Sequence, residues 1–412
     1  MSQTREIAGP SQMPGSRPST AAAPAAARGR SSWLRSTPVA SSLTFCVFLI
    51  VFAAYTLWLG KNFSSASNRL LDIHQNVPLL MVGLALVVCL ASGQFDLSVS
   101  GMTTLTTYLS VGLVVNQNLP FGLVMLICVG CGLGGGILNA FLVIRLRVNA
   151  FIATLGTGAG FAGLSTVYSG GTQLAPTPTS SALPKWFSGA GSFGSYQTKA
   201  PAVVTWLVLL FLVGVVTYVA LERSEVARRS RTLLVAGVGL LVVVALLLTV
   251  LHEVISDMPW TVLFLLAVAF GLWLTLRYTT FGRYLYATGG NAEAARLAGV
   301  HVNRLKAAAF IISATLSSIA GVVLGAIQGS ASPDIAAGFL LPAFAAAFLS
   351  TVLLSTGRFH IWGTLIGGIF LIGVSQGLII GGVNFTWTGV INGVVLVAAV
   401  SLSTALRREG GR

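Results

Sequence analysis

The chain has 412 residues, of which 55% are hydrophobic and only 8% are charged. A soluble domain carries roughly 25% charged residues, so this composition excludes an ordinary water-soluble fold and indicates one integral membrane unit without a separate enzyme domain. The formal net charge is +14, but the basic residues lie in tails and short loops and form no stripe with interleaved aromatic residues. Nucleic acid is therefore not an expected partner.

The chain opens with a polar tail and continues as a series of apolar runs. Residues 1–39 are rich in Ala, Ser, Pro and Arg, which predicts a disordered cytoplasmic tail. Each later run is long enough to cross a hydrocarbon core of ~30 Å as a helix. Twelve spans are predicted, near residues 40–60, 77–93, 99–116, 119–143, 150–168, 202–221, 233–251, 260–276, 307–327, 340–355, 362–380 and 386–404. The predicted fold class is an all-α polytopic membrane protein, with a transmembrane domain over residues 40–405 and a cytoplasmic tail over residues 406–412.

The distribution of Lys and Arg predicts the orientation of these spans. Cytoplasmic loops of membrane proteins carry an excess of basic residues. If the N-terminus is inside, all but four of the 24 Lys and Arg residues fall on the cytoplasmic side, the exceptions being Lys61, Arg69, Lys185 and Lys199. Both termini are therefore predicted to be cytoplasmic.

Many spans carry two glycines four residues apart. Small residues at this spacing allow helix backbones to approach closely within a membrane. The pairs are Gly132 and Gly136, Gly156 and Gly160, Gly321 and Gly325, Gly363 and Gly367, Gly373 and Gly377, and Gly389 and Gly393. We expect them to be helix-packing contacts, in a bundle that would also suit a transporter whose helices rock against each other.

Motifs of enzymes and of metal sites are missing from the sequence. The four histidines, His74, His252, His301 and His360, fall in predicted loops with no acid at metal-ligand spacing. The phosphate-binding motif GxxxxGK[ST] does not occur, so the chain is not expected to hydrolyse ATP by that route. No catalytic residue, metal site or cofactor is predicted.

Asp96 stands at a break in the apolar pattern, in the segment SGQFDLSVSG between the second and third spans. One interpretation is a helix cap, in which the carboxylate accepts the free N–H groups of the helix that begins at Leu97 or Ser98. The other is contact with a substrate or a proton, because buried ionisable groups in membranes serve such relays. The lack of partner charges counts against proton coupling.

The segment 277–306, RYTTFGRYLYATGGNAEAARLAGVHVNRLK, lies between two spans on the Arg-rich side. Asn291 is predicted to cap a short helix, with Glu293 in the first turn, where the helix dipole favours an acid. Gly299 is predicted to end that helix. A short helix braced between two spans would act as a rigid lever.

Glu293, Ala294 and Ala295 followed by Gly299 match the EAA-x-x-x-G signature of binding-protein-dependent ABC import permeases, which this chain resembles. The longer string FGRYLYATGGNAEAARLAGV is similar to the ribose and xylose permease branch, and GQFDLSVSG, NAFIATLGT and RFHIWGTLIGG resemble three further segments. Roughly residues 40–200 and 258–405 share the resemblance, while residues 201–251 look like the two-helix insertion that xylose-type permeases add to a ten-helix core. The chain departs from the family at Leu349-Ser350, where a glycine pair is usual, and at Asn149, where Pro is commoner. These departures bear on the sugar rather than on transport.

The resemblance implies a transport assembly in the bacterial inner membrane. Two permease subunits, expected as a homodimer, would form the pathway, with cytoplasmic ATPase subunits below and a periplasmic or lipid-anchored binding protein that delivers a ribose- or xylose-like sugar. The ATPase-coupling helix would comprise Asn291, Glu293, Ala294, Ala295 and Gly299. The polar residues expected near the sugar path are Asp96, Asn139, Thr154, Gln376 and also Asn384, with helix-packing hydrogen bonds as their alternative role.

Other classes remain as alternatives. An ion-coupled secondary transporter of a small neutral solute would require buried ionisable groups and no ATPase. A structural or export membrane protein would have the glycine-rich bundle but no use for the EAA-type loop. Within the import class, the alternative solutes are a signalling furanone, a purine nucleoside or a polyol.

Overall fold

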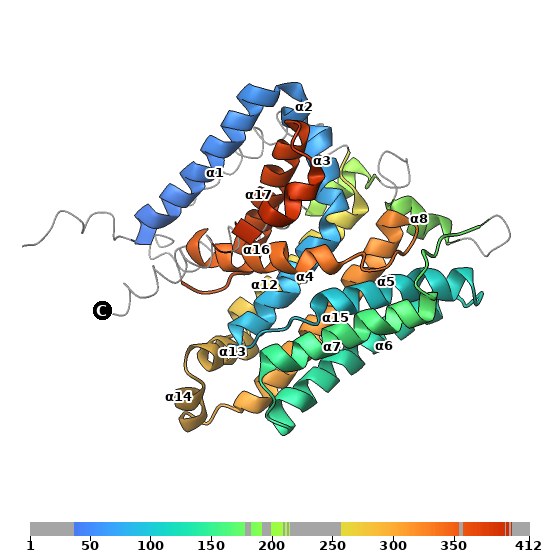
Figure 1. Ribbon diagram of the computed structural model, residues 1–412. Helices are drawn as coiled ribbons and strands as arrows, with labels where there is room; N and C mark the ends of the chain where they lie inside the picture. Colours follow the sequence, from blue (N-terminus) through green and yellow to red (C-terminus); the bar gives the residue numbers. More distant parts are fainter. Residues whose placement is uncertain are drawn as a thin grey trace, which may run out of the picture. The chain divides into compact units, whose positions relative to one another are not determined.

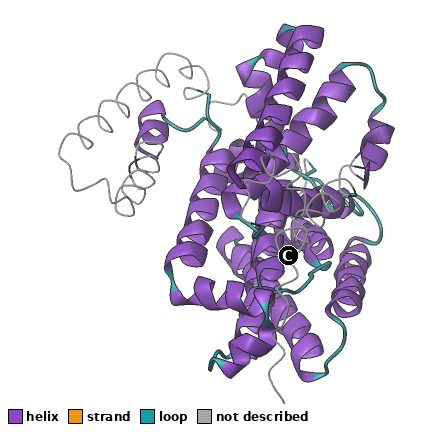
Figure 2. Ribbon diagram, turned by 90° about the vertical axis from the view of Figure 1, so that its left-hand side faces the viewer, coloured by secondary structure: helices purple, strands orange, loops and turns teal. Residues whose placement is uncertain are grey.

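The computed structural model describes residues 37–177, 183–191, 199–208, 257–353 and 357–391, with the single positions 211, 214, 393, 394 and 397. Within these residues the secondary structure is helical, and the extended backbone is limited to two isolated bridges, Leu174 with Ala331 and Lys199 with Pro259. Figure 2 shows this helical content directly. The all-α class predicted from the sequence is confirmed for the described residues.

The helices follow the apolar runs of the sequence (Figure 1). Their bounds are α1 Thr37–Leu59, α2 Lys61–Ser64, α3 Ala66–Gln75, α4 Val77–Ala91, α5 Val99–Val115, α6 Phe121–Ala140, α7 Ala150–Ser169, α8 Lys185–Gly191, α12 Trp260–Tyr278, α13 Thr280–Gly290, α14 Ala292–Leu297, α15 Val302–Gln328, α16 Leu340–Leu353 and α17 Ile361–Ile380. A π-helical turn, η2 Phe141–Arg145, extends α6, and two 3₁₀ turns are η4 Ala337–Phe339 and η5 Phe385–Trp387.

Five of the described helices are long and apolar enough to cross a membrane: α6 with η2, α7, α12, α15 and α17. The pair α3 and α4 adds a sixth if the two helices are one bent span. Shorter apolar helices occupy Phe48–Leu59, Val99–Val115 and Ala337–Leu353, where spans are also predicted. The predicted spans at 202–221, 233–251 and 386–404 lie largely outside the described residues, as do most of the tail over 1–39, the tail over 406–412 and most of the insertion over 201–251. The count of twelve and the cytoplasmic termini stay predictions.

α15 lies at the centre of the packing, against α4, α5 and α6 (Figure 1). Hydroxyl groups of α5 cross to the backbone of α15: Thr103 Oγ1 donates to the Ser317 carbonyl at 3.0 Å and Thr107 Oγ1 to the Gly321 carbonyl at 2.9 Å. Thr106 Oγ1 donates likewise to the Ser318 carbonyl at 3.0 Å. Three such bonds between two helices require close backbones, which the small residues of α15 permit.

The glycine pairs of the sequence divide into two groups. Four pairs, at 132 and 136, 321 and 325, 363 and 367, and 373 and 377, face neighbouring elements at short distance. A β-carbon on Gly132, for example, would lie 2.7 Å from Ser318 Cβ. The pairs at 156 and 160 and at 389 and 393 have nothing within 4 Å among the described residues. Packing is therefore confirmed for the first group, whereas each pair of the second group has no neighbour within the described part of the chain.

The first testable consequence concerns α6. We expect Gly136→Ala to destabilise the protein by about 1–3 kcal/mol, because the new methyl group would overlap the Ile311 Cα and the Phe310 carbonyl on α15. Gly134→Ala is the matched control, because that position of the same helix has nothing within 4 Å. Thermal unfolding of the purified protein, followed by tryptophan fluorescence, distinguishes the two. Equal midpoints for both variants would contradict the assigned α6–α15 contact.

The hydropathy pattern does not predict α3, the helix that precedes α4. α3 meets α4 at an angle of 57°. His74 is buried inside α3, where Nε2 donates to the Gly191 carbonyl (2.8 Å) and Nδ1 pairs with the Thr261 hydroxyl (2.6 Å). The prediction that His74 lies in a loop is wrong. Its segment is polar and would be expected to be exposed from the sequence, but contacts with α8 and α12 bury it within a helix.

Candidate coupling helix and transmembrane polar sites

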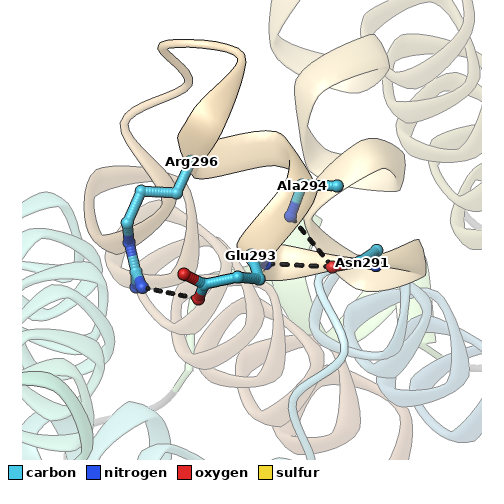
Figure 3. Close-up of polar contacts among 4 residues, drawn as sticks. All are labelled: Asn291, Glu293, Ala294 and Arg296. Atoms are coloured by element: carbon cyan, nitrogen blue, oxygen red, sulfur yellow. Dashed lines mark hydrogen bonds and ion pairs between the residues drawn. The ribbon is translucent and has the colours of Figure 1, made fainter. Parts of the chain in front are cut away.

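α14 is a short helix between the membrane-long helices α12 and α15, and its start is capped as the sequence predicts (Figure 3). Asn291 Oδ1 accepts from the backbone N–H of Glu293 at 3.1 Å and of Ala294 at 2.9 Å. Gly299 follows the C-terminal end with φ of +82°, a left-handed conformation that favours glycine. The chain thus fixes both ends of a single helical unit locally, before any partner binds.

One side of α14 rests on the protein and the other is presented outward. Ala295 is buried, while the Glu293 carboxylate and the Arg296 guanidinium form an exposed ion pair at 3.2 Å (Figure 3). Leu297 is 84% exposed. The outward side of α14 thus presents one large apolar side chain beside the ion pair. Sequence reasoning missed Leu297, since a leucine in a helical segment normally predicts a core residue.

α13 directly precedes α14 in the chain and packs against the end of α4 and the loop that follows it. Gly289 of α13 packs backbone to backbone against this loop: a β-carbon on Gly289 would overlap the Ala91 carbonyl oxygen and lie 3.0 Å from Gly93 N. Gly93 has φ of +77°, so the loop turns there through a conformation suited to glycine. Gly289 and Gly93 thus bring α13, which leads into α14, into direct backbone contact with the loop that contains Asp96.

Asp96 belongs to a buried hydrogen-bond chain that spans three helices. Asp96 Oδ1 accepts from the Ser98 N–H at 3.0 Å and from Ser98 Oγ at 2.6 Å. Asn139 Nδ2 of α6 donates to Ser98 Oγ at 2.7 Å, and Thr157 Oγ1 of α7 donates to Asn139 Oδ1 at 2.6 Å. The predicted cap is not formed as expected, because α5 begins at Val99 without a side-chain cap and Asp96 instead accepts from Ser98, the residue before the helix. The hydrogen bonds beyond Ser98 fix α6 and α7 to the start of α5.

Thr154 attaches the same loop to α7 by a second route. The Leu97 N–H donates to Thr154 Oγ1 at 3.0 Å, and this hydroxyl donates to the Ala150 carbonyl at 2.7 Å. Asp96 Oδ2 and Ser313 Oγ of α15 are buried without a hydrogen-bond partner among the described residues. Three predicted path residues, Asp96, Asn139 and Thr154, therefore lie in one network, and the side chains of these three residues are fully buried.

Gln376 lies apart from this network. It lines a cavity of about 220 Å³ between the start of α4, α16 and α17, together with Asn76, Ser375 and Thr388. Asn384 is elsewhere again, where its Oδ1 accepts from the Thr386 N–H at 3.0 Å and caps the η5 turn. The structure thus forms two polar regions from the predicted path residues, one buried network and one open cavity.

Apolar membrane-long helices and close glycine contacts between them define a polytopic membrane protein, with the short capped helix α14 between two of the long helices. The chain belongs to the family described as the permease component of the branched-chain amino acid transport system, whose model matches residues 73–400. Membership confirms the predicted resemblance to importer permeases and the prediction of a non-catalytic membrane subunit.

Known proteins with similar sequences match nearly the whole chain. The xylose transport system permease protein XylH of Escherichia coli strain K12 is 27% identical over 380 residues, covering 89% of this chain and 94% of the relative. The ribose import permease protein RbsC of the same strain is 28% identical over 359 residues, covering 86% and 91%. XylH of Haemophilus influenzae is 26% identical over 387 residues, covering 91% and 99%. No solved structure matches the chain.

Proposed function

We propose that this chain is the transmembrane subunit of an ABC importer in the bacterial inner membrane, which carries a monosaccharide of the ribose or xylose kind. A binding protein would deliver the sugar and a separate ATPase would drive its passage. Similarity to xylose and ribose permeases over almost the full length supports the sugar class. The observation that carries the proposal is the capped, outward-facing α14 between two membrane-long helices.

α14 is the coupling helix in this proposal. Asn291 and Gly299 define its ends, and Ala294 and Ala295 keep it slim enough to enter a cleft of the ATPase. Glu293 is held by Arg296 in the free chain and is exposed enough to pair with a basic residue of the ATPase. Leu297 adds an apolar anchor. The predicted orientation, with Lys and Arg concentrated inside, places this helix in the cytoplasm.

Movement of α14 would pass to the membrane helices through α13. Because Gly289 is in direct backbone contact with the loop 92–98, a displacement of α13 must also displace that loop. The loop holds Asp96 and Ser98, whose hydrogen bonds reach Asn139 on α6 and Thr157 on α7. ATPase closure would thereby shift the positions of α5, α6 and α7 as a group.

The sugar path would use neutral polar groups, because the solute is uncharged and must be released. The cavity with Gln376, Ser375 and Asn76 offers amide and hydroxyl groups of this kind. We place Asp96, Asn139 and Thr154 at the deep end of the path, where they are buried in the described state. A second permease subunit would cover the small-residue face of α7, since Gly156 and Gly160 have no neighbour within 4 Å among the described residues.

A second candidate function is ion-coupled transport, favoured by the complete burial of the ionisable Asp96 side chain. In an ion-coupled carrier Asp96→Asn would remove uptake driven by a proton or sodium gradient, because the titratable group is lost. In the proposed importer the same variant retains uptake driven by ATP, because an Asn side-chain oxygen still accepts from the Ser98 N–H and hydroxyl.

The deciding experiment reconstitutes the chain with its co-purifying ATPase and binding protein in proteoliposomes and measures xylose and ribose uptake together with ATP hydrolysis. Uptake that requires ATP and the binding protein supports the proposal. Uptake that persists without the ATPase, follows an ion gradient and fails in Asp96→Asn would overturn it in favour of the carrier. ATP-driven uptake of a nucleoside but of neither sugar would overturn the sugar class alone.

A further inference from the structure

A basic cleft of about 750 Å³ lies between the end of α12, α13 and the start of α17. Three arginines from three different segments line it, Arg277 from α12, Arg283 from α13 and Arg358 from the residues before α17. His360 and Tyr286 complete the polar part of the wall, and Trp273 contributes to the apolar part. None of the described residues that line the cleft is acidic. The part of the wall that the structure describes therefore carries three guanidinium groups and no carboxylate.

The two other titratable groups do not offset this charge. Burial raises the pKa of Tyr286 to about 12, and its hydroxyl donates to the Phe359 carbonyl at 2.7 Å. Burial and the neighbouring Arg277 lower the pKa of His360, which favours its neutral imidazole. His360 Nδ1 is buried and has no hydrogen-bond partner within the part of the chain that the structure describes. A neutral imidazole can present this nitrogen as a further donor.

The N-terminus of α17 adds to the same side of the cleft. α17 is a helix of 20 residues that begins directly after His360, and no side chain caps it. Its first N–H groups carry the positive end of the helix dipole, where anions are stabilised. The three guanidinium groups, an unused imidazole nitrogen and an uncapped helix start thus favour the same kind of ligand, an oxyanion.

The aromatic residues around the cleft indicate its depth in the membrane. The Trp273 ring centroid lies 5.4 Å from Tyr278 and 6.4 Å from Trp362, and these residues stand at the end of α12 and the start of α17. Trp and Tyr are enriched at the level of the lipid headgroups, where their rings are apolar and their N–H or O–H groups meet water. An oxyanion at this level, next to an apolar wall that includes Ile361, is most readily the phosphate of a lipid.

We propose that this cleft binds the phosphate of an anionic phospholipid headgroup from the cytoplasmic leaflet. The arginines hold the phosphate oxygens, because the planar guanidinium presents paired donors that match phosphate geometry. The glycerol extends from the phosphate toward the apolar part of the cleft wall, where Trp273 contributes a small exposed edge. Gly290 also lines the cleft, one residue before the Asn291 cap, so a bound lipid braces the base of α14. This last consequence rests on the proposed coupling function, whereas lipid binding itself does not.

The test uses the full chain purified in detergent and titrated with phosphatidylglycerol, with lipid adducts counted by native mass spectrometry and stability followed by thermal unfolding. Phosphatidylcholine with the same acyl chains and inorganic phosphate are the two comparison probes. We expect phosphatidylglycerol to bind and stabilise selectively. Arg277→Gln and Arg283→Gln are each expected to weaken its binding by about fivefold, the effect of roughly one surface charge. Arg296→Gln and Arg304→Gln, which lie outside the cleft, are the matched controls.

Three results would overturn the proposal. Equal binding of phosphatidylcholine would show that no anion is selected, and equal stabilisation by inorganic phosphate would assign the cleft to a soluble anion. Unchanged lipid binding in both arginine variants, with loss of assembly with the ATPase, would assign the cleft to an acidic surface of that partner. If Arg277→Gln and Arg283→Gln fail to fold, Arg358→Gln and the comparison of probes on the unaltered chain still decide, and neither measurement depends on sugar transport.

Discussion

Leu297→Asp is expected to abolish assembly with the ATPase while the permease itself still folds. Leu297 is 84% exposed, so nothing within the described chain depends on its side chain. If α14 enters a cleft of the ATPase, burial of this leucine contributes about 1.5–3 kcal/mol. An aspartate in its place would lose that contribution and add the cost of burying a carboxylate, several kcal/mol more. The association constant should fall by about 100-fold or more.

The measurement is co-purification of the ATPase with the permease, followed by ATP-driven uptake. Leu297→Met is the matched control, since it keeps an apolar side chain of similar volume and should bind nearly as well. The thermal midpoint of the isolated permease should be the same in both variants. Normal assembly of Leu297→Asp would mean that this side of α14 stays in solvent and that another surface docks the ATPase.

Local chemistry explains what the sequence predicted well. The Asn291 cap follows from rules that act over two or three residues, and the observed bonds to the Glu293 and Ala294 N–H groups follow them. Helix positions were likewise predictable, because an apolar run of membrane length has few alternatives to a helix. The orientation of the chain across the membrane and the number of spans depend on the correct assignment of every apolar run, and both remain predictions.

The remaining features arise from contacts between segments far apart in sequence. Asp96, Asn139 and Thr157 form one network, although 61 positions separate the first from the last, and their spacing gives no sign of it. The basic cleft likewise gathers Arg277 and Arg358, which in sequence are simply the basic ends of two loops. Gln376 was grouped with Asp96 because both are polar residues at breaks or late in spans, yet helix packing places it in a different cavity.

Gly289→Ala is expected to uncouple ATP hydrolysis from uptake, lowering the sugar carried per ATP by about tenfold. The added methyl group would overlap the Ala91 carbonyl oxygen and crowd Gly93 N. Both are backbone atoms, so no side chain can turn away to make room, and overpacking of this kind costs typically 1–3 kcal/mol. α13 must then separate from the loop 92–98, and the motion of α14 no longer reaches Asp96 and Ser98. ATPase docking through Leu297 should be retained.

The neighbouring glycine provides an unusually close control for this prediction. Gly290 has nothing within 4 Å and ordinary negative φ, so Gly290→Ala should leave the coupling ratio unchanged. Uptake and ATP hydrolysis would be measured in the same proteoliposomes for both variants, with co-purified ATPase as the check on assembly. A normal ratio in Gly289→Ala would mean that α13 and the loop 92–98 move independently, and that motion of α14 reaches the membrane helices directly through α12 and α15 instead.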